Sequence, residues 1–303
     1  MIAVVGGYGI GLTMRVERAP EAGETVSNGT LTIGPGGKGS NQAIGIARLG
    51  HAVSLLTAVG DDAAAMDAKA LWSVEGVCFG AVATVIEKPT MTGFITVDAA
   101  GENRISIAPG ALAGLTVADV DGFRAVIREA ELLVVSLEVP IEVARHCLRV
   151  AREEGTRTML NPAPAIELEP SDWNLIDVIT PNASEGSILF VGSSGLEPNQ
   201  LAARLAEYGP SVVLTLGPRG CVVADTSGVI VLDPVHVASV VDTTGAGDAF
   251  AAALAVGLVE GMTLVEAAHF AAAAGAYAVT IAEVVPALPR RADVENLTRK
   301  ELL

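Results

Sequence analysis

Short runs of apolar, often β-branched residues alternate with helical patterns along most of the chain. A first run opens the chain as MIAVVGG, and later runs occupy residues 52–60, 131–137, 156–162, 175–182 and 211–217. Helical stretches follow several of them, including residues 61–76 and 140–155, and the second is expected to end in a C-cap at Gly155. Nearly continuous apolar strands that alternate with helices predict an α/β fold with a mainly parallel sheet covered on both faces.

Two segments break this rhythm. Residues 12–33 and 91–108 alternate apolar and polar side chains around the turn signals Ser-Asn-Gly and Ala-Ala-Gly-Glu-Asn. Such a pattern is typical of antiparallel hairpins with one face in water. We therefore expect a small β-sheet that projects from the main body as a lid, with residues 1–303 forming a single domain.

The composition narrows the classes of function. Half of the residues are hydrophobic, which is enough for a large packed core, and 35 acidic against 19 basic residues give a formal net charge of −16. No run of Lys or Arg provides the basic patch of a nucleic-acid-binding protein. Any anionic ligand must therefore be bound by local groups, and we expect no nucleic-acid partner.

The chain shows no pattern of export, of membrane insertion or of transition-metal binding. Its start lacks the basic region of a signal peptide, and the longest apolar stretches, 249–259 and 267–282, are bounded by Glu260 and Glu266. Three widely spaced cysteines fit no disulfide framework and are expected as small core residues, and the four histidines lack metal-ligand spacing. We expect a cytoplasmic protein without a membrane partner.

The segment GPGGKGSNQAIGIARLG, residues 34–50, is a glycine-rich turn that leads into a helix. It fails as a P-loop, because Gly39 separates Lys38 from the hydroxyl residue, and GGYGIG at residues 6–11 lacks the spacing of a dinucleotide site. The turn fits a plain helix start with an exposed lysine. Its three glycines in four positions favour a site where the backbone approaches a ligand, with Lys38 and Asn41 as hydrogen-bond donors.

The segment VVDTTGAGDAF, residues 240–250, places glycines where another helix begins. The free N–H groups of a first helical turn and the positive end of its dipole form an anion site. Asp248 lies in that turn, where a carboxylate most often caps its own helix. A carboxylate beside an anion site is also what phosphoryl transfer to an alcohol requires, because one group accepts the hydroxyl proton while donors stabilise the phosphate.

Together, PGGKGSNQA (35–43) and DTTGAGDAF (242–250) resemble the two signatures of the ribokinase-like (PfkB-type) carbohydrate kinases. The resemblance covers nearly the whole chain and includes AVGDD (58–62), GENRI (101–105), NPAPA (161–165), TPN-x-x-E (180–185) and TLGPRG (215–220). It implies a ribokinase-like three-layer sandwich with a small β-sheet lid that often mediates homodimers. It also implies ATP and Mg²⁺ as cofactors and a small sugar-like substrate.

The resemblance further implies a role for each matching position. Asp248 would be the catalytic base, and the backbone of Gly245, Ala246 and Gly247 the anion hole. Gly37, Lys38, Asn41 and Glu138 would bind the substrate, Asn182, Thr215, Gly217 and Gly220 would lie on the nucleotide side, and Glu185 would hold Mg²⁺ through water. Asp242 is the candidate ligand of a monovalent cation, K⁺.

Three departures from the family pattern affect the expected function. Gly9 and Gly11 stand where these kinases usually carry an Asn and an Asp that bind the sugar, and Ala272 replaces an Asn near the adenine. The loop AEVVPA (282–287) lacks the family's glycine and leaves the use of K⁺ open. We expect a kinase for a sugar or sugar-like substrate other than ribose. The alternatives are a nucleoside kinase of the same fold and a non-catalytic sugar- or nucleotide-binding protein.

Overall fold

The computed structural model describes residues 1–100, 102–193 and 195–301. Within these residues the largest sheet has eight strands in the order β14-β13-β12-β11-β10-β9-β1-β4. They are β1 (Ile2–Val5), β4 (Val53–Leu56), β9 (Leu132–Ser136), β10 (Arg157–Asn161), β11 (Val178–Ile179), β12 (Ser211–Thr215), β13 (Cys221–Asp225) and β14 (Gly228–Leu232). Neighbours from β4 to β12 are parallel, and β13 and β14 add antiparallel strands at one edge. The mainly parallel sheet is confirmed.

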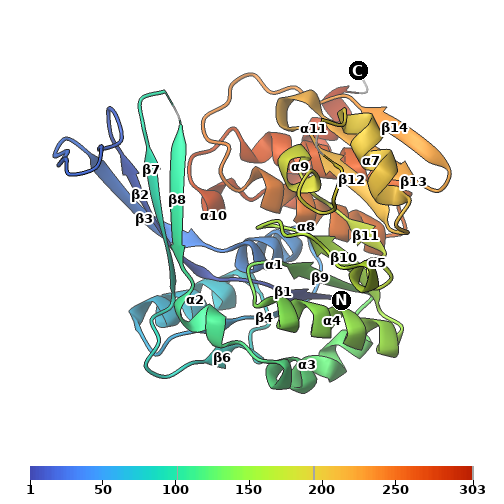
Figure 1. Ribbon diagram of the computed structural model, residues 1–303, viewed down its shortest axis with the longest axis horizontal. Helices are drawn as coiled ribbons and strands as arrows, with labels where there is room; N and C mark the ends of the chain where they lie inside the picture. The colour runs from blue at the N-terminus through green and yellow to red at the C-terminus, as the bar shows by residue number, and fades with distance from the viewer. Residues whose placement is uncertain (101, 194, 302–303) are drawn as a thin grey trace.

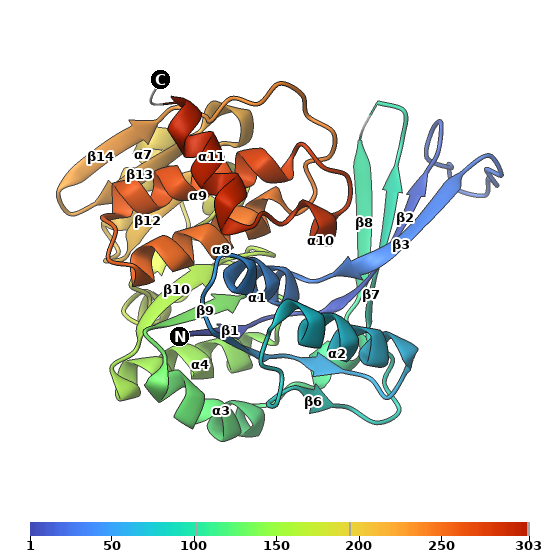
Figure 2. The same cartoon turned by 180° about the vertical axis from the view of Figure 1, so that it is seen from behind.

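Helices cover both faces of this sheet (Figures 1 and 2). On one face lie α1 (Lys38–Arg48), α2 (Ala63–Glu75), α8 (Ala246–Val259), α9 (Leu264–Ala278) and α11 (Arg291–Glu301), and on the other α3 (Val117–Glu129), α4 (Ile141–Glu154) and α7 (Pro198–Ala206). Shorter pieces are α5 (Pro170–Trp173), α6 (Ala183–Gly186), α10 (Val284–Ala287), η1 (Gly110–Gly114) and η2 (Gly217–Arg219). The three-layer sandwich is therefore confirmed.

The strands divide their side chains between two hydrophobic cores. On β1, Ile2 and Val4 face the core beneath α1 and α8, whereas Ala3 and Val5 face the core beneath α3 and α4. Helix α8 is apolar on nearly all sides because it lies between the sheet, α1 and α9. This packing fixes its N-terminus beside the start of α1.

A smaller four-stranded sheet projects from the main body next to α10 (Figure 1). Its order is β3-β2-β7-β8, with β2 (Gly9–Arg15), β3 (Thr30–Gly36), β7 (Met91–Val97) and β8 (Asn103–Ala108). The two expected hairpins are joined by parallel pairing of β2 with β7. Strand β2 begins at Gly9, earlier than residue 12, and Gly101 of the expected second segment lies outside the described residues. A further pair, β5 (Ala58–Val59) and β6 (Ala83–Thr84), lies beside the main sheet.

The C-cap of α4 agrees with the sequence, whereas the burial of the cysteines agrees only in part. Helix α4 ends at Gly155 with φ +78°, the predicted left-handed C-cap. Cys147 and Cys221 are buried as expected, but Cys78 is exposed. None of the helices in the described residues is long and apolar enough to cross a membrane.

Candidate active site

The start of α8 is built around Gly245 and Asp248. Gly245 has φ +82°, and a Cβ there would lie 2.7 Å from Val284 Cγ1, so the turn requires glycine. Asp248 lies in the first helical turn and is only 7% exposed. The Ala246 N–H makes a long 3.3 Å bond to the Thr243 carbonyl, and a Cβ on Gly247 would point into open space. The helix start thus has room for an anion beside a buried carboxylate.

The start of α1 lies against the turn that follows β1. Gly37 has φ +93°, and a Cβ there would lie 2.6 Å from the Gly7 carbonyl oxygen. This close approach lets Glu138, which follows β9, accept two backbone hydrogen bonds on Oε2, from Lys38 N at 2.7 Å and from Gly7 N at 3.2 Å. Lys38 and Glu138, both expected on the substrate side, therefore meet at the carboxyl edge of the sheet.

Four charged side chains influence one another here. Burial raises the pKa of Glu138 to about 7, against the opposing effect of Lys38 and with a contribution from Asp248. Burial also raises the pKa of Glu185. For Lys38, burial alone would lower the pKa, but Asp248, Glu138 and Glu185 together raise it. The raised pKa favours the protonated form of the lysine among three carboxyl groups.

Two amides donate to Asp248. Asn41 Nδ2 lies 2.7 Å from Oδ2, and Gln42 Nε2 lies 3.3 Å from Oδ1. Asn41 was predicted to bind substrate, but its N–H donor is directed at Asp248, while its Oδ1 is buried with no partner among the described residues. Gln42 was missed by the sequence reasoning, although it stands in the quoted PGGKGSNQA segment next to Asn41.

The expected nucleotide residues lie along the neighbouring strand ends. Asn182 caps α6: its Oδ1 accepts the Glu185 N–H at 2.8 Å, and Glu185 Oε2 accepts the Asn182 N–H at 2.8 Å. Thr215 pairs with Asn182 across a single β-bridge. Gly217 (φ +59°) and Gly220 (φ +84°) shape the next turn, and a Cβ on Gly220 would lie 2.0 Å from the Leu232 oxygen. The structure brings these five residues together on one side of the candidate site.

Asp242 joins the main body to the small sheet. Its Oδ1 accepts hydrogen bonds from Thr244 N at 2.9 Å and Thr244 Oγ1 at 2.7 Å, and its Oδ2 accepts the Glu283 N–H at 3.3 Å. Arg15, on β2, places a guanidinium nitrogen 3.9 Å from Oδ2. The face of the small sheet that carries Arg15 is therefore turned toward α8, and we call it the inner face.

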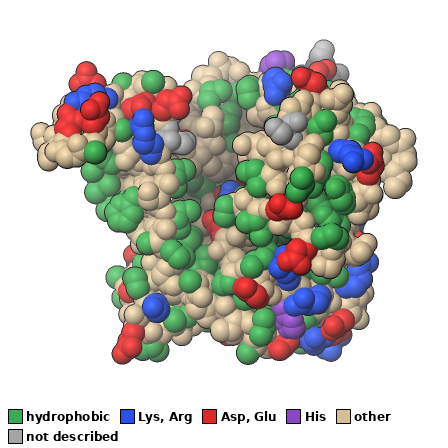
Figure 3. All heavy atoms as spheres, viewed as in Figure 1, with side chains coloured by type: hydrophobic (Ala, Val, Ile, Leu, Met, Phe, Trp, Pro, Cys, Tyr) green, Lys and Arg blue, Asp and Glu red, His purple; other side chains and the backbone are tan. Residues whose placement is uncertain are grey.

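Glycines occupy the centre of the inner face. Gly11 pairs with Gly34 on β3 and with Gly93 on β7, which in turn pairs with Ile107 on β8. Paired residues share one face of a sheet, so this glycine row faces the hollow that Figure 3 shows between the small sheet and the main body. A Cβ on Gly11 would meet no heavy atom closer than 3.6 Å, whereas one on Gly9 would lie 2.6 Å from the Met91 oxygen.

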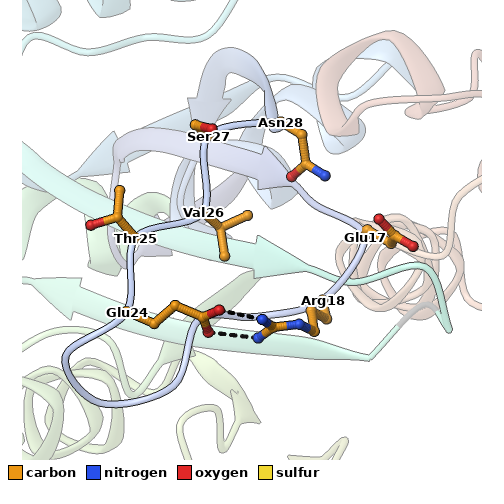
Figure 4. Close-up of a pocket in the computed structure, with 7 residues that line it drawn as sticks. All are labelled: Glu17, Arg18, Glu24, Thr25, Val26, Ser27 and Asn28. Atoms are coloured by element: carbon orange, nitrogen blue, oxygen red, sulfur yellow. Dashed lines mark hydrogen bonds and ion pairs between the residues drawn. The ribbon is translucent and has the colours of Figure 1, made fainter.

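A separate cavity lies in the connection between β2 and β3 (Figure 4). It is lined by Glu17, Arg18, Glu24, Thr25, Val26, Ser27 and Asn28. Arg18 donates to both carboxylate oxygens of Glu24, so the guanidinium already has a partner. None of the predicted site residues lines this cavity.

A buried carboxylate, a cation and a helix start with room for an anion, all beside a covering sheet, are the features that phosphoryl transfer to a hydroxyl requires. A family model described as pfkB family carbohydrate kinase matches residues 1–291. The chain belongs to the pfkB family of carbohydrate kinases, and it is a kinase. The resemblance noted in the sequence is thereby confirmed.

Curated relatives and a solved structure agree with this membership. The bifunctional ribokinase/ribose-5-phosphate isomerase A of Fructilactobacillus sanfranciscensis is 33% identical over 312 residues, which cover 99% of this chain and 56% of that protein. The chain thus spans about half the length of that relative. A deoxyribokinase of Salmonella typhi is 34% identical over 257 residues, 82% of each chain. The ribokinase of Arabidopsis thaliana complexed with ribose and ATP has a TM-score of 0.87 and 29% identity, covering 98% of this chain and 97% of that one.

Proposed function

We propose that this kinase transfers the γ-phosphoryl group of ATP to a hydroxyl of a small sugar or sugar-like substrate, with Asp248 as the general base. The main support for this proposal is the buried Asp248 carboxylate, which lies at the α8 N-terminus beside Lys38. The matching family is one of carbohydrate kinases, and the Arabidopsis thaliana ribokinase to which the chain is similar binds ribose and ATP. Residues 1–303 would act as one catalytic domain, and the expected cytoplasmic location stays a prediction.

The residues divide the reaction between them. Asp248 accepts the proton of the attacking hydroxyl, and the first-turn N–H groups of Gly245, Ala246 and Gly247 stabilise the charge on the transferring phosphoryl group. Glu138 and Lys38 hold the substrate beside Asp248. Closure of the small sheet as a lid excludes water, so that the phosphoryl group passes to the substrate rather than to water.

Mg²⁺ would enter with the nucleotide. The described residues contain no group of three or more His, Cys, Asp or Glu side chains that could hold a metal ion by themselves. Glu185 uses Oε2 for the cap of α6, which leaves Oε1 for a water of the metal. Such a site fits an ion that keeps several waters and is bound through phosphates. Asn182, Thr215, Gly217 and Gly220 would line the nucleotide around it.

Asp242 is less suited to K⁺. Its oxygens already accept hydrogen bonds from Thr244 and Glu283, and the Arg15 guanidinium supplies positive charge beside it. We therefore propose that Arg15 takes the place of a monovalent cation and that catalysis does not require K⁺.

Asp248→Asn tests the proposed function. The change is nearly isosteric, so folding and ATP binding should persist, while kcat falls by about 10²- to 10⁴-fold through loss of the base. The assay is ADP release with ATP and Mg²⁺ across a panel of sugars and nucleosides at saturating substrate. Activity near that of the native protein would remove Asp248 from the mechanism.

Ribose should be a poor substrate. A carboxylate that binds a sugar hydroxyl contributes roughly 1.5–3 kcal/mol, about tenfold to a hundredfold in affinity, and Gly11 provides none. Gly9 cannot simply be exchanged for a larger residue, because its Cβ would collide with the Met91 carbonyl oxygen. The packing at the base of the small sheet therefore requires a residue without a side chain at position 9.

Gly11→Asp tests this specificity, because its Cβ has room. We expect kcat/KM for ribose to rise about tenfold to a hundredfold. Thr13→Asp is the matched control, since it adds the same charge on the same strand and face but nearer the tip. High ribose efficiency in the native protein, or an equal gain in the control, would contradict the proposal.

One observation favours a nucleoside as the second candidate substrate. The glycine row and Ile107, which is 53% exposed, give the inner face a flat and apolar surface. Such a surface suits a planar base attached to a sugar. Higher kcat/KM for nucleosides than for free pentoses and hexoses on the panel would establish this candidate.

The outer face of the small sheet, opposite Arg15, suits a second copy of the chain. It exposes Leu31 (54%), Ile33 (61%), Phe94 (55%) and Met14 (38%). A contiguous apolar face of this kind is unusual on a monomer. We propose a homodimer that buries these side chains between two small sheets.

A further inference from the structure

Behind Asp248 lies a chain of buried amides that no step of the proposed reaction uses. Gln42 Nε2 donates to Asp248 Oδ1 at 3.3 Å and to Asn161 Oδ1 at 3.1 Å. Asn161 Nδ2 in turn donates to the Thr180 carbonyl oxygen at 3.1 Å. Gln42 comes from α1, Asn161 from the end of β10 and Thr180 from the segment after β11, so the chain crosses three elements.

The direction of every bond in this chain is fixed. A backbone carbonyl can only accept, so Asn161 must present its NH₂ group to Thr180 and its oxygen to Gln42. Gln42 must then present its NH₂ group to both Asn161 and Asp248. Rotating the Gln42 amide would place its oxygen against two acceptors. The carbonyl of Thr180 therefore determines, through two amides, that Asp248 receives a donor on Oδ1.

This orientation leaves an unfavourable contact elsewhere. Gln42 is completely buried, and its Oε1 has no hydrogen-bond partner among the described residues. A buried acceptor without a partner costs free energy of folding. The orientation of the Gln42 amide thus lowers stability but directs a hydrogen-bond donor at Asp248, the proposed base. This combination points to a role of Gln42 in the reaction.

We infer that Gln42, anchored by Asn161, is a positioning residue that holds the Asp248 carboxylate in the orientation needed to accept the substrate proton. This inference rests on the proposed role of Asp248. Asn41 donates to Oδ2 and Gln42 donates to Oδ1, so the two hydrogen bonds restrain rotation of the carboxylate about its terminal torsion. Thr180 lies two residues before Asn182, which ties the orientation of the base to the segment on the nucleotide side.

Gln42→Met tests the inference, because methionine has a similar volume and no donor. We expect kcat to fall about tenfold to a hundredfold, the loss of one hydrogen bond to a charged group, while KM for both substrates stays close to the native value. Methionine removes the unpaired Oε1 but also leaves Asn161 Oδ1 without its donor, so thermal stability should change little. A purely structural role predicts a lower melting temperature with native kcat.

A double-mutant cycle separates the two roles further. In the Asp248→Asn background Gln42→Met should change the residual rate by less than about twofold, because its effect acts only through the carboxylate. Thr57→Val is the matched control: Thr57 is completely buried and its hydroxyl has no partner among the described residues, so kcat should stay native. Gln42→Glu, which keeps the shape but places an acceptor against Asp248, should lower kcat at least as much as Gln42→Met and serves if the Met variant fails to fold.

Native kcat in both Gln42 variants, or an equal loss from Gln42→Met in the two backgrounds, would overturn the positioning role. If Asp248→Asn destroys activity in the same experiment, the proposed function survives that result. Full activity of Asp248→Asn would overturn the base and the positioning role together.

Discussion

Glu138 shows how one buried carboxyl group makes stability depend on pH. Its folded-state pKa of about 7 lies above the ordinary value of 4.5, because burial disfavours the charge. The folded state thus holds the proton more tightly than the unfolded chain. The resulting stabilisation is complete below about pH 4.5 and is lost as the pH rises through about 7.

We therefore expect the free energy of unfolding of the native protein to fall between pH 5 and 8 by about 3 kcal/mol more than that of Glu138→Gln. The variant keeps an acceptor for the Lys38 and Gly7 N–H groups but does not titrate. Urea denaturation of both proteins at several pH values gives the comparison. Parallel pH curves for the two proteins would show that Glu138 is not a buried titrating group.

Sequence reasoning named charged and small residues of the candidate site but missed two buried amides. Glycine-rich turns and helix starts surround Lys38, Asp248 and Glu185. In such segments a charged side chain is recognisable from the sequence as a capping or ligand-binding group. Gln42 and Asn161 have no such local signal in the sequence, because their contacts in the candidate site join residues more than 100 positions apart. The same limit applies to the hydrogen bond from Asn41 to Asp248, which has no local signal, while the substrate contact of Asn41 stays a prediction.

At the scale of elements, the ion pair between Arg15 and Asp242 connects strand β2 to the segment before α8. Arg15 is largely exposed, so the pair should contribute little to global stability. Its expected effect is on the site, where it neutralises Asp242.

We expect native activity to be nearly equal in KCl and in tetramethylammonium chloride, and Arg15→Ala to become dependent on K⁺, because Asp242 loses its neutralising charge. Arg104→Ala is the control, since Arg104 pairs with Asp98 within the small sheet. The readout is initial velocity at constant ionic strength. A strong requirement of the native enzyme for K⁺ would contradict the proposal that Arg15 takes the place of the cation.

Local patterns predicted most elements but not their partners. The buried parallel strands and the cap at Gly155 follow from apolar runs and glycine chemistry. The antiparallel edge strands β13 and β14 were not identified from the sequence. Pairing of β2 with β7 joins residues about 80 positions apart and has no local signal. Strand β2 was expected to begin at residue 12, where the apolar and polar alternation starts, whereas Gly9 and Gly11 are already paired on two sides.

At the scale of the whole molecule, the two faces of the small sheet have different expected partners. The inner face covers the site, and the outer face exposes Ile33 and its apolar neighbours. If a second copy covers the outer face, a charge there should disrupt assembly without touching the catalytic groups.

Ile33→Asp should therefore convert a dimer to a monomer at micromolar concentration, because burying an unpaired carboxylate in an apolar interface is strongly unfavourable. Ile105→Asp is the matched control: Ile105 is similarly exposed but pairs with Ile95 on the inner face. Light scattering measures the mass of each protein. A native protein that is already monomeric at this concentration would rule out the dimer.

The glycine row also bears on how such a kinase could change during evolution. A glycine codon that ends in a pyrimidine becomes an aspartate codon when its middle base changes from G to A. The structure has room for an aspartate side chain at position 11 but not for a larger residue at position 9. One of the two sugar contacts expected from the family pattern would thus be accessible by a point mutation, while the other would require the β2 and β7 backbones to separate. Selection for growth on a new sugar would be expected to recover changes at position 11 first and to reach position 9 only after substitutions near Met91.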